Sequence, residues 1–163
     1  MSENAPRDLT EVLNAHRAGF DVALGFRYVR ATADEVVMEY QIGPQHRQPY
    51  GIVHGGVHCA IVESACSAGA GLAALARGQS VVGVENHTSF IHAVREGIVT
   101  VRAVPLSRGR RSHVWEATSR DADGRVIATG RVRLLCLEAG TDLAGRSVGT
   151  HTLDPFVTDE RKA

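Results

Sequence analysis

The chain lacks an excess of either charge. Lys and Arg together number 18, as do Asp and Glu, so the formal net charge is zero. A protein without a net positive field does not draw in nucleic acid or an anionic membrane as a whole, although local clusters still can. Aromatic residues are also scarce, at 5% with a single Trp, and no basic helix face carries interleaved aromatics. The composition therefore favours neither a nucleic-acid partner nor a membrane partner.

Cysteines are few as well. Cys59, Cys66 and Cys136 form an odd set without Cys-X-X-Cys spacing, and no apolar segment typical of a signal peptide stands before them. We therefore expect reduced cysteines in a cytoplasmic protein. Internal repeats and linker-like segments are absent from the sequence, and its 163 residues, 44% hydrophobic and 22% charged, fit one globular domain.

One long apolar stretch, residues 55–76, stands out from this background. It is built mainly from Ala, Gly, Ser and Cys, and a single acid, Glu63, interrupts it. As a membrane span it would hold Glu63 near mid-bilayer, which costs roughly 2.5 to 3.5 kcal/mol on insertion scales. A helix that is apolar on every side and rich in small residues is better explained as the centre of a soluble fold, closely enclosed by a sheet.

The other segments predict that sheet. Turn residues separate runs of β-type sequence, and Asp123-Gly124 is a strong hairpin signal. The predicted elements are a short amphipathic helix at 8–18, strands at 26–29 and 35–42, the long helix, and strands at 80–90, 98–106, 112–120 and 125–137. This order predicts an α+β fold in which an antiparallel sheet wraps around one long central helix.

The chain is expected to divide into three parts. Residues 1–19 are an N-terminal segment with the short helix, residues 20–138 form the domain, and residues 139–163 form a flexible tail. The tail is polar, contains Gly and Pro, and shows no periodic pattern.

Glu63 is the first candidate for a catalytic residue. An unpaired carboxylate in a low-dielectric interior costs several kcal/mol and is usually retained for chemistry. Gly55 and Gly56 open the same helix, where free backbone N–H groups can stabilise developing negative charge. Ser67 lies four residues after Glu63, hence on the same face, where its hydroxyl can hold a water beside the carboxylate. A carboxylate together with an oxyanion site indicates acyl transfer.

Several segments carry a family resemblance. They are Gln48-Pro49-Tyr50-Gly51-Ile52-Val53-His54-Gly55-Gly56, Glu63-Ser64 with Ser67, Val81-Val82-Gly83-Val84-Glu85, Arg95-Glu96-Gly97 and Arg108-Gly109-Arg110-Arg111. The chain resembles the hotdog-fold acyl-CoA thioesterases over roughly residues 20–137. The similar branch holds phenylacetate-pathway, Arthrobacter-type 4-hydroxybenzoyl-CoA and 1,4-dihydroxy-2-naphthoyl-CoA thioesterases. The resemblance implies a hotdog fold and hydrolysis of an acyl-CoA thioester with an aromatic or hydroxylated-aromatic acyl group, with no metal or redox cofactor.

The resemblance also implies roles for single residues. Glu63 is implied to be the nucleophile or the general base, and the N–H of Gly55 to bind the thioester oxygen. Gln48 and His54 are implied to assist binding and polarisation. Ser67 occupies the position of a Ser or Thr that orients the hydrolytic water.

Arg108, Arg110 and Arg111 crowd one turn around Gly109. Such a cluster is a solvated surface turn or, in an acyl-CoA enzyme, a site for the 3′-phosphate and pyrophosphate of CoA. The turn is more basic than in the 4-hydroxybenzoyl relative, so the nucleotide contacts of that relative do not transfer directly.

The spacing of Gly55 and Glu63 bears on assembly. Eight residues separate them, about 12 Å at 1.5 Å per residue, which is too far for both to act on one carbonyl group. A second copy whose helix runs antiparallel alongside would bring Gly55 of one subunit to Glu63 of the other. We therefore expect a homodimer, or a tetramer formed by two dimers, with shared active sites.

Other interpretations stay open at this stage. Glu63 would also suit a structural ion pair with a buried Arg, His54 a helix cap, and Ser67 simple packing. His54 and His58 have the i, i+4 spacing of a helical metal site but lack two further ligands. The GxGxxA-like pattern at 69–74 lies inside the helix, which argues against dinucleotide binding. Two other functions compete with hydrolysis: a non-catalytic acyl-CoA-binding sensor and a hotdog acyl-CoA hydratase.

Overall fold

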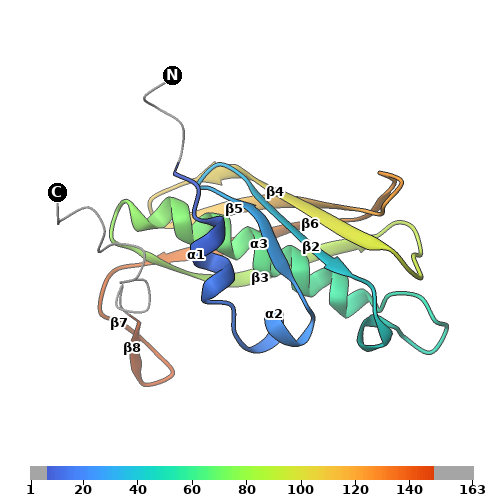
Figure 1. Cartoon of the computed structure of the whole chain (residues 1–163). Coiled ribbons are helices and arrows are strands. Elements are labelled where there is room, and N and C mark those ends of the chain that lie inside the picture. Colours follow the sequence, from blue (N-terminus) through green and yellow to red (C-terminus); the bar gives the residue numbers. More distant parts are fainter. Residues whose placement is uncertain (1–6, 149–163) are drawn as a thin grey trace.

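The computed structural model describes residues 7–148, in which one antiparallel sheet curves over a long helix (Figure 1). The sheet has six strands in the order β1-β2-β4-β5-β6-β3. The strands are β1 (Arg27–Ala31), β2 (Val36–Gln41), β3 (Ser80–Phe90), β4 (Ile98–Arg108), β5 (Ser112–Arg120) and β6 (Val126–Leu137). The helices are α1 (Thr10–Ala15), α2 (Gly19–Ala23), the 3-10 helix η1 (Pro44–His46) and the central α3 (Gly55–Leu75). The predicted fold class is confirmed, and the six predicted strands are found with ends within two residues.

The core lies between the inner face of the sheet and one side of α3. Inner-face residues alternate with outer ones along β5, and Trp115 at the centre of that strand is fully buried. Small residues on α3 allow this close packing. A Cβ on Gly69 would stand 2.4 Å from two carbons of the Trp115 ring, so only glycine fits there. The small residues of the helix thus let the sheet approach, as the sequence predicts.

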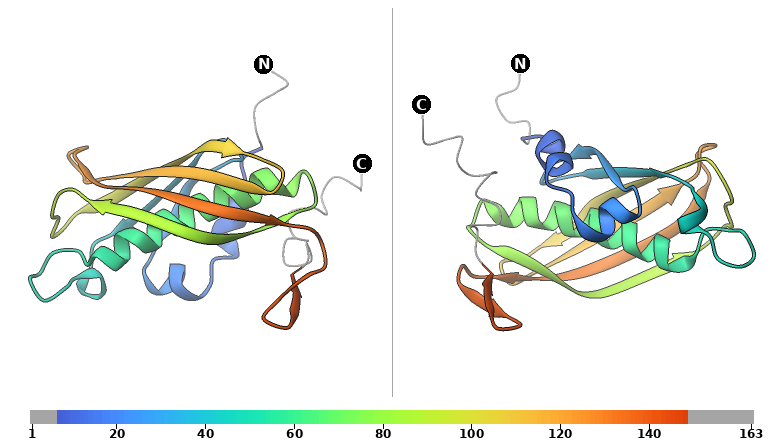
Figure 2. Two further views of the ribbon diagram at one scale, coloured as in Figure 1. Left: turned by 180° about the vertical axis from the view of Figure 1, so that it is seen from behind. Right: turned by 60° about the horizontal axis from the view of Figure 1, so that its bottom comes forward.

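The flank of α3 that lies beside the edge strand β3 is only partly enclosed. Glu63 and Ser67 are half-buried, whereas Ile61, Val62 and Cys66 are fully buried against the sheet. The expectation of a helix enclosed on every side is therefore wrong for the single chain, because the sheet covers only one side of the helix (Figure 2). By length and composition α3 could cross a membrane, but half of its most apolar window is buried inside the chain, and it is the core helix of this fold.

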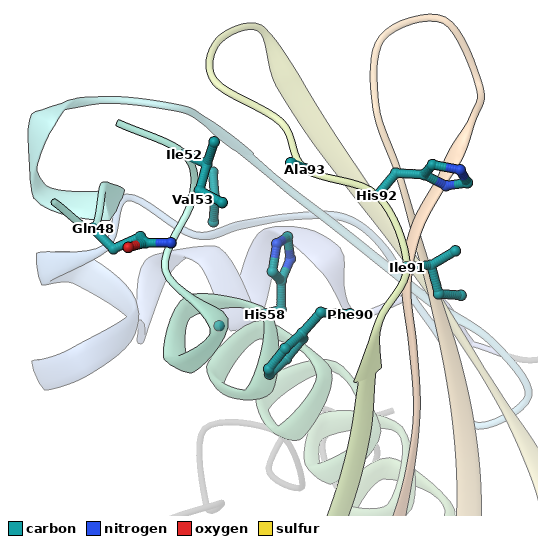
Figure 3. Close-up of a pocket in the computed structure, with 9 residues that line it drawn as sticks. Gln48, Ile52, Val53, His58, Phe90, Ile91, His92 and Ala93 are labelled. Carbon is teal, nitrogen blue, oxygen red and sulfur yellow. The ribbon is translucent and has the colours of Figure 1, made fainter. Parts of the chain in front are cut away.

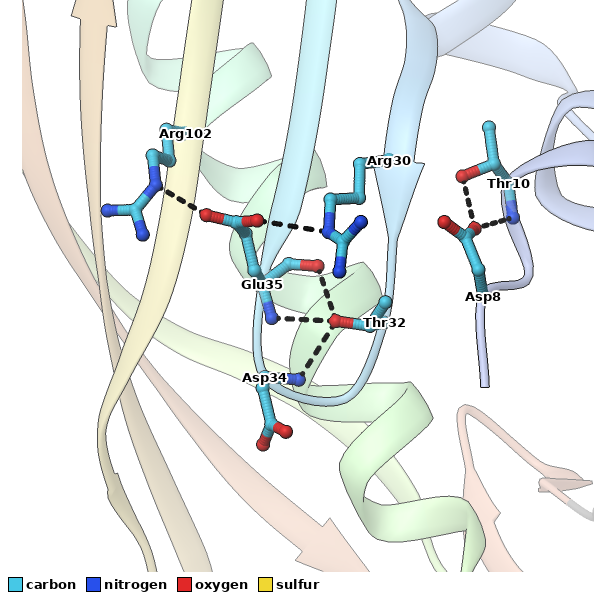
Figure 4. A network of polar contacts seen from close by, with 7 residues as sticks. All are labelled: Asp8, Thr10, Arg30, Thr32, Asp34, Glu35 and Arg102. Carbon is cyan, nitrogen blue, oxygen red and sulfur yellow. Dashed lines mark hydrogen bonds and ion pairs between the residues drawn. The ribbon is translucent and has the colours of Figure 1, made fainter. Parts of the chain in front are cut away.

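The N-terminal region differs from the single helix predicted at 8–18. The first helix, α1, ends at Ala15. A second short helix, α2, begins at Gly19, after an extended Ala18 and with a Gly19 φ of +54°. Asp8 accepts hydrogen bonds from the N–H (2.9 Å) and hydroxyl (2.6 Å) of Thr10 (Figure 4). The bond from the Thr10 hydroxyl lowers the pKa of Asp8.

The turn between β1 and β2 is organised by Thr32. Its hydroxyl accepts hydrogen bonds from the N–H groups of Asp34 (3.2 Å) and Glu35 (3.0 Å) and donates to the Glu35 carbonyl (3.0 Å). The Glu35 carboxylate then lies between Arg30 and Arg102 of the two neighbouring strands (Figure 4). These ion pairs are exposed, so they contribute little to folding stability.

A two-stranded hairpin follows the domain, formed by β7 (Thr141–Leu143) and β8 (Arg146–Val148). The sequence does not predict it. Its turn is made by Ala144 and Gly145, both at positive φ, a conformation that short hairpin turns require. The predicted tail begins at residue 139, and its residues 149–163 lie outside the described residues, so the flexibility of the tail stays a prediction.

Candidate active site

The loop before α3 is held in place by backbone hydrogen bonds. Gln48 N–H donates to the Ile52 carbonyl (2.9 Å), and Gly51 N–H donates to the Gln48 carbonyl (2.8 Å). Gly51 adopts a φ of +75°, which favours glycine at this tight turn. Arg95 Nη1 donates to the Tyr50 carbonyl at 2.7 Å. These bonds fix Gln48 beside the start of the helix.

The helix start presents one free donor. His54 is the N-cap residue of α3, and its Nδ1 accepts the N–H of Gly56 at 2.8 Å. The N–H of Gly55 donates to no group in the described part of the chain. Because the helix dipole adds partial positive charge at this end, the Gly55 N–H is suited to bind an oxyanion.

A cavity of about 170 Å³ lies at this helix start. Its lining includes Gln48, Gly55, His58 and Phe90, and in Figure 3 the His58 side chain rises from α3 beside the ring of Phe90. A Cβ on Gly55 would stand 2.6 Å from a carbon of the Phe90 ring. Glycine at position 55 therefore leaves room both for the aromatic ring and for a ligand that approaches the backbone.

His58 is a lining residue that the sequence analysis does not single out for catalysis. It is 3% exposed, and its ring centroid lies 5.9 Å from that of Phe90. Burial lowers the pKa of His58 to about 4, so its imidazole is neutral at physiological pH. Its Nδ1 is buried and has no hydrogen-bond partner among the residues that the structure describes. Within residues 7–148, no group of three His, Cys, Asp or Glu side chains able to hold a metal is found around His54 and His58 or elsewhere.

Glu63 lies further along α3, on the half-buried side of the helix. Ser67 Oγ donates to Glu63 Oε1 at 3.2 Å, and Asn86 Nδ2 on β3 donates to Glu63 Oε2 at 3.1 Å. No Arg pairs with Glu63 in the described residues, which removes the ion-pair interpretation. The Glu63 carboxylate is thus hydrogen-bonded rather than lone, and it is half-buried rather than fully buried as the sequence analysis assumes.

The arginine turn lies at the other end of α3. Arg77 Nη2 donates to the Gly109 carbonyl (3.4 Å) and Gln79 Nε2 to the Arg110 carbonyl (3.3 Å), so residues that follow the helix hold the turn. Arg108 pairs with Asp34 at 2.5 Å and is already engaged. Arg110 and Arg111 are exposed, and their side chains form no ion pair or hydrogen bond within residues 7–148.

Apart from the arginine turn, the structure brings the predicted catalytic residues together in two separate groups. Gln48 and Gly55 line one cavity, and His54 caps the helix beside it without lining it. Glu63 and Ser67 form the second group about two helical turns away. The cavity does not include Glu63, so one chain does not complete the predicted site.

Similarity to known proteins places the chain in a family. The model of the thioesterase superfamily matches residues 50–128. The chain is 37% identical over 123 residues to the proofreading thioesterase EntH of Cronobacter turicensis, covering 75% of this chain and 89% of EntH. The chain belongs to the thioesterase superfamily.

Two solved structures support the assignment of this chain to the thioesterase superfamily. Rv1847 of Mycobacterium tuberculosis, whose name presents it as a candidate esterase, is 43% identical over 122 residues, covering 74% of this chain and 87% of that protein. Its structure gives a TM-score of 0.73 at 42% identity and covers 74% of this chain and 97% of that chain. Thioesterase HI1161 of Haemophilus influenzae gives a TM-score of 0.74 at 29% identity, covering 79% of this chain and 90% of that chain.

The family supports thioester hydrolysis as the general activity and does not favour a sensor or a hydratase. Asn86 is a residue of this thioesterase that the sequence analysis missed as a contact of Glu63. Asn86 and Thr88 are two residues apart on a strand and therefore face the same side, but the sequence does not show which side that is. The pairing of β3 with β6 shifts register between Gly83 and Glu85, just before these residues. Such a bulge changes which side chains face the helix, so the sequence alone does not place Asn86.

Proposed function

We propose that this thioesterase hydrolyses acyl-CoA thioesters with an aromatic or hydroxylated-aromatic acyl group, such as phenylacetyl, hydroxybenzoyl or 1,4-dihydroxy-2-naphthoyl, to the free acid and CoA. The observation that carries hydrolysis is the Glu63 carboxylate, held by Ser67 on the open side of the core helix. The apolar part of the cavity lining, with Phe90 and Ile52, supports an aromatic acyl group, as does the resemblance of the 48–56 segment.

In the proposed reaction the thioester oxygen accepts the Gly55 N–H, which stabilises the charge that develops on it. Gln48 lies in the same cavity and assists in binding the carbonyl group. Glu63 of the partner subunit either takes a proton from a water held with Ser67, which then adds to the carbonyl carbon, or attacks that carbon itself to form an anhydride that water hydrolyses. In both routes the carbon–sulfur bond breaks and CoA leaves as the thiol.

The proposal includes a second copy of the chain. Strand β3 is an edge strand of 11 residues, paired only with β6, and most of its residues are exposed. A long unpaired edge beside the half-buried side of α3 is suited to pair with another sheet. With the two α3 helices antiparallel, Gly55 of one subunit would meet Glu63 of the other. We propose a homodimer, or two such dimers in a tetramer.

The exposed Arg110 and Arg111 are proposed to bind the CoA phosphates. Their side chains are unpaired within the described residues and stand on a turn whose carbonyl groups are held by Arg77 and Gln79. Arg108 contributes less, because it already pairs with Asp34. A cytoplasmic site of action is part of the proposal and is supported by the three unpaired cysteines, since disulfides are rare in reducing compartments.

The test is a panel of acyl-CoA thioesters assayed for thiol release. We expect kcat/KM to be higher for phenylacetyl, hydroxybenzoyl and naphthoyl thioesters than for acetyl- or butyryl-CoA, because pocket walls set the choice among acyl groups. A preference of about tenfold or more for the short aliphatic substrates would overturn the aromatic assignment. Absence of thiol release from every substrate, with binding retained, would favour the sensor, and modification of the acyl chain without thiol release would favour the hydratase.

A further inference from the structure

A chain of hydrogen bonds runs from strand β3 to the Glu63 carboxylate. Thr88 Oγ1 donates to Asn86 Oδ1 at 2.6 Å. Asn86 Nδ2 donates to two acceptors on α3, the backbone carbonyl of Cys59 at 3.0 Å and Glu63 Oε2 at 3.1 Å. None of these contacts is part of the carboxylate and serine pair on which the proposed function rests.

The orientation of the Asn86 amide follows from its partners. A backbone carbonyl only accepts hydrogen bonds, so the amide nitrogen must face Cys59. The amide oxygen then faces Thr88, whose hydroxyl can donate to it. Both amide hydrogens are used, one on the helix backbone and one on Glu63. Thr88 holds the amide oxygen of Asn86 and the Cys59 carbonyl holds its amide nitrogen, so the side chain is fixed independently of its contact with Glu63.

Both oxygens of Glu63 consequently have a fixed donor. Ser67 donates a hydrogen bond to Oε1 from the helix, and Asn86 donates one to Oε2 from the sheet. The backbone of Gly83 on β3 packs directly against the carboxylate, since a Cβ at that position would lie 2.1 Å from Glu63 Oε1. The carboxylate thus occupies a slot between α3 and β3 that only a residue without a side chain at position 83 leaves open.

The network contributes little to folding stability in the single chain. Asn86 is exposed and Glu63 is half-buried, and hydrogen bonds between accessible polar groups exchange almost evenly with bonds to water. Its effect is geometric, because a carboxylate with a donor on each oxygen keeps one rotamer. We propose that Asn86, supported by Thr88, is a positioning residue that holds the Glu63 carboxylate in its reactive orientation. This inference rests on the proposed function of Glu63.

The kinetic test uses the best substrate of the acyl-CoA panel. Because small displacements of a catalytic group lower rates steeply, we expect Asn86→Ala to lower kcat by about tenfold to a hundredfold with KM changed less than about threefold. Thr88→Val should lower kcat by about threefold to tenfold, and Thr88→Ser, which keeps the hydroxyl, should retain wild-type kcat. Ser89→Ala is the matched control. Ser89 is the next residue after Thr88 on β3, but it lines a different surface cavity, with Glu116 and Arg131, and does not contact Asn86 or Glu63 through a hydrogen bond in the described residues.

A double variant separates positioning from general damage. If Thr88 acts only through Asn86, Thr88→Val added to Asn86→Ala should change kcat by less than about twofold, whereas independent effects would multiply. The inference is overturned if Asn86→Ala keeps more than half of kcat while Glu63→Ala loses activity, an outcome that leaves the proposed function intact. Multiplying effects in the double variant would overturn the role of Thr88.

A structural arm decides the inference independently of activity. In crystal structures, we expect one Glu63 rotamer in the wild type and in Ser89→Ala, and a displaced or divided carboxylate in Asn86→Ala. An unchanged carboxylate in Asn86→Ala would overturn the inference. If the wild type releases no thiol from any thioester, or Glu63→Ala remains active, the proposed function fails, and these structures still show whether Asn86 orients Glu63.

Discussion

Three histidines near the start of α3 illustrate how environment decides the role of a residue type. His46 is fully buried, with Nδ1 accepting the Gly43 N–H and Nε2 bonded to the Leu24 carbonyl, both at 2.8 Å, so it is a structural core residue. His54 is exposed and caps the helix. His58 is buried against the cavity, and its Nδ1 has no partner within residues 7–148. The sequence analysis considers His58 only with His54, as a metal-site spacing, and does not predict that His46 and His58 are buried, because burial depends on packing partners distant in the chain.

At Glu63, replacement by Ala should lower kcat by about a hundredfold or more with a smaller change in KM, since the carboxylate acts mainly in the transition state. Folding should survive, because the side chain is half-buried and contacts only Ser67 and Asn86 through hydrogen bonds. Thiol release and a thermal melt measure the two effects. Retention of more than about a tenth of wild-type kcat would rule out Glu63 as the essential group.

At His58, we expect a pH-dependent stability. Burial lowers the pKa of His58 from 6.5 to about 4, so between these values the unfolded chain binds a proton that the folded chain does not. This contribution to stability is fully present above about pH 6.5 and is lost as the pH falls toward 4. Thermal melts from pH 7 to pH 4 should show a shallower decline in His58→Leu than in the wild type. His113, whose pKa is also lowered by burial, contributes in the same direction, so the decline should not vanish. Equal slopes in the two proteins would contradict the prediction.

At the scale of elements, the turn between β4 and β5 depends on residues beyond the end of α3. Gln79 is 3% exposed and bonds Arg77 (2.9 Å), Glu138 (3.0 Å) and the Arg110 carbonyl (3.3 Å). A buried, fully bonded amide of this kind fixes the backbone around it. The turn therefore presents Arg110 and Arg111 from a rigid base while their side chains reach solvent.

Arg110→Ala combined with Arg111→Ala should raise KM for acyl-CoA and leave kcat nearly unchanged, because phosphate contacts far from the carbonyl contribute uniform binding. Added salt should weaken wild-type binding in the same way. Arg108→Ala is the matched control from the same turn and should have the smaller effect, since Arg108 pairs with Asp34. An acyl-pantetheine thioester lacks the nucleotide phosphates. Equal loss of affinity for that truncated substrate would show that the turn is not a phosphate site.

At the scale of the whole molecule, the two groups of site residues are separated by the length of helix between Gly55 and Glu63, about 12 Å. The cavity at Gly55 excludes Glu63, and both β3 and one side of α3 are open in the single chain. In the proposed dimer, each active site takes Gly55 from one subunit and Glu63 from the other. Assembly and activity are therefore linked in the proposed enzyme.

Mixing two inactive variants tests this link. Glu63→Ala removes the carboxylate, and Gly55→Pro removes the donor N–H. In a mixed dimer one site carries both defects and the other carries neither, so activity should return toward half of the wild-type value per dimer. Mass spectrometry monitors subunit exchange, and melts confirm that both variants fold. If exchange occurs and no activity returns, the shared site is refuted.

The sequence by itself determined the order of the six sheet strands and the central helix, the fold class and the thioesterase family. Turn residues and alternating patterns located six strands, and the small-residue composition of 55–75 identified the central helix, because these signals are local. It also paired Glu63 with Ser67, since a spacing of four on a helix fixes a shared face.

Only the tertiary structure decided what surrounds those residues. It left one flank of α3 partly open, ended the N-terminal helix at Ala15, and brought Asn86 into contact with Glu63 on a strand whose register shifts at Gly83. It also buried His58 beside Phe90, a residue 32 positions away in the chain. These outcomes depend on contacts between distant segments and on one irregular strand, which no local pattern of residues encodes.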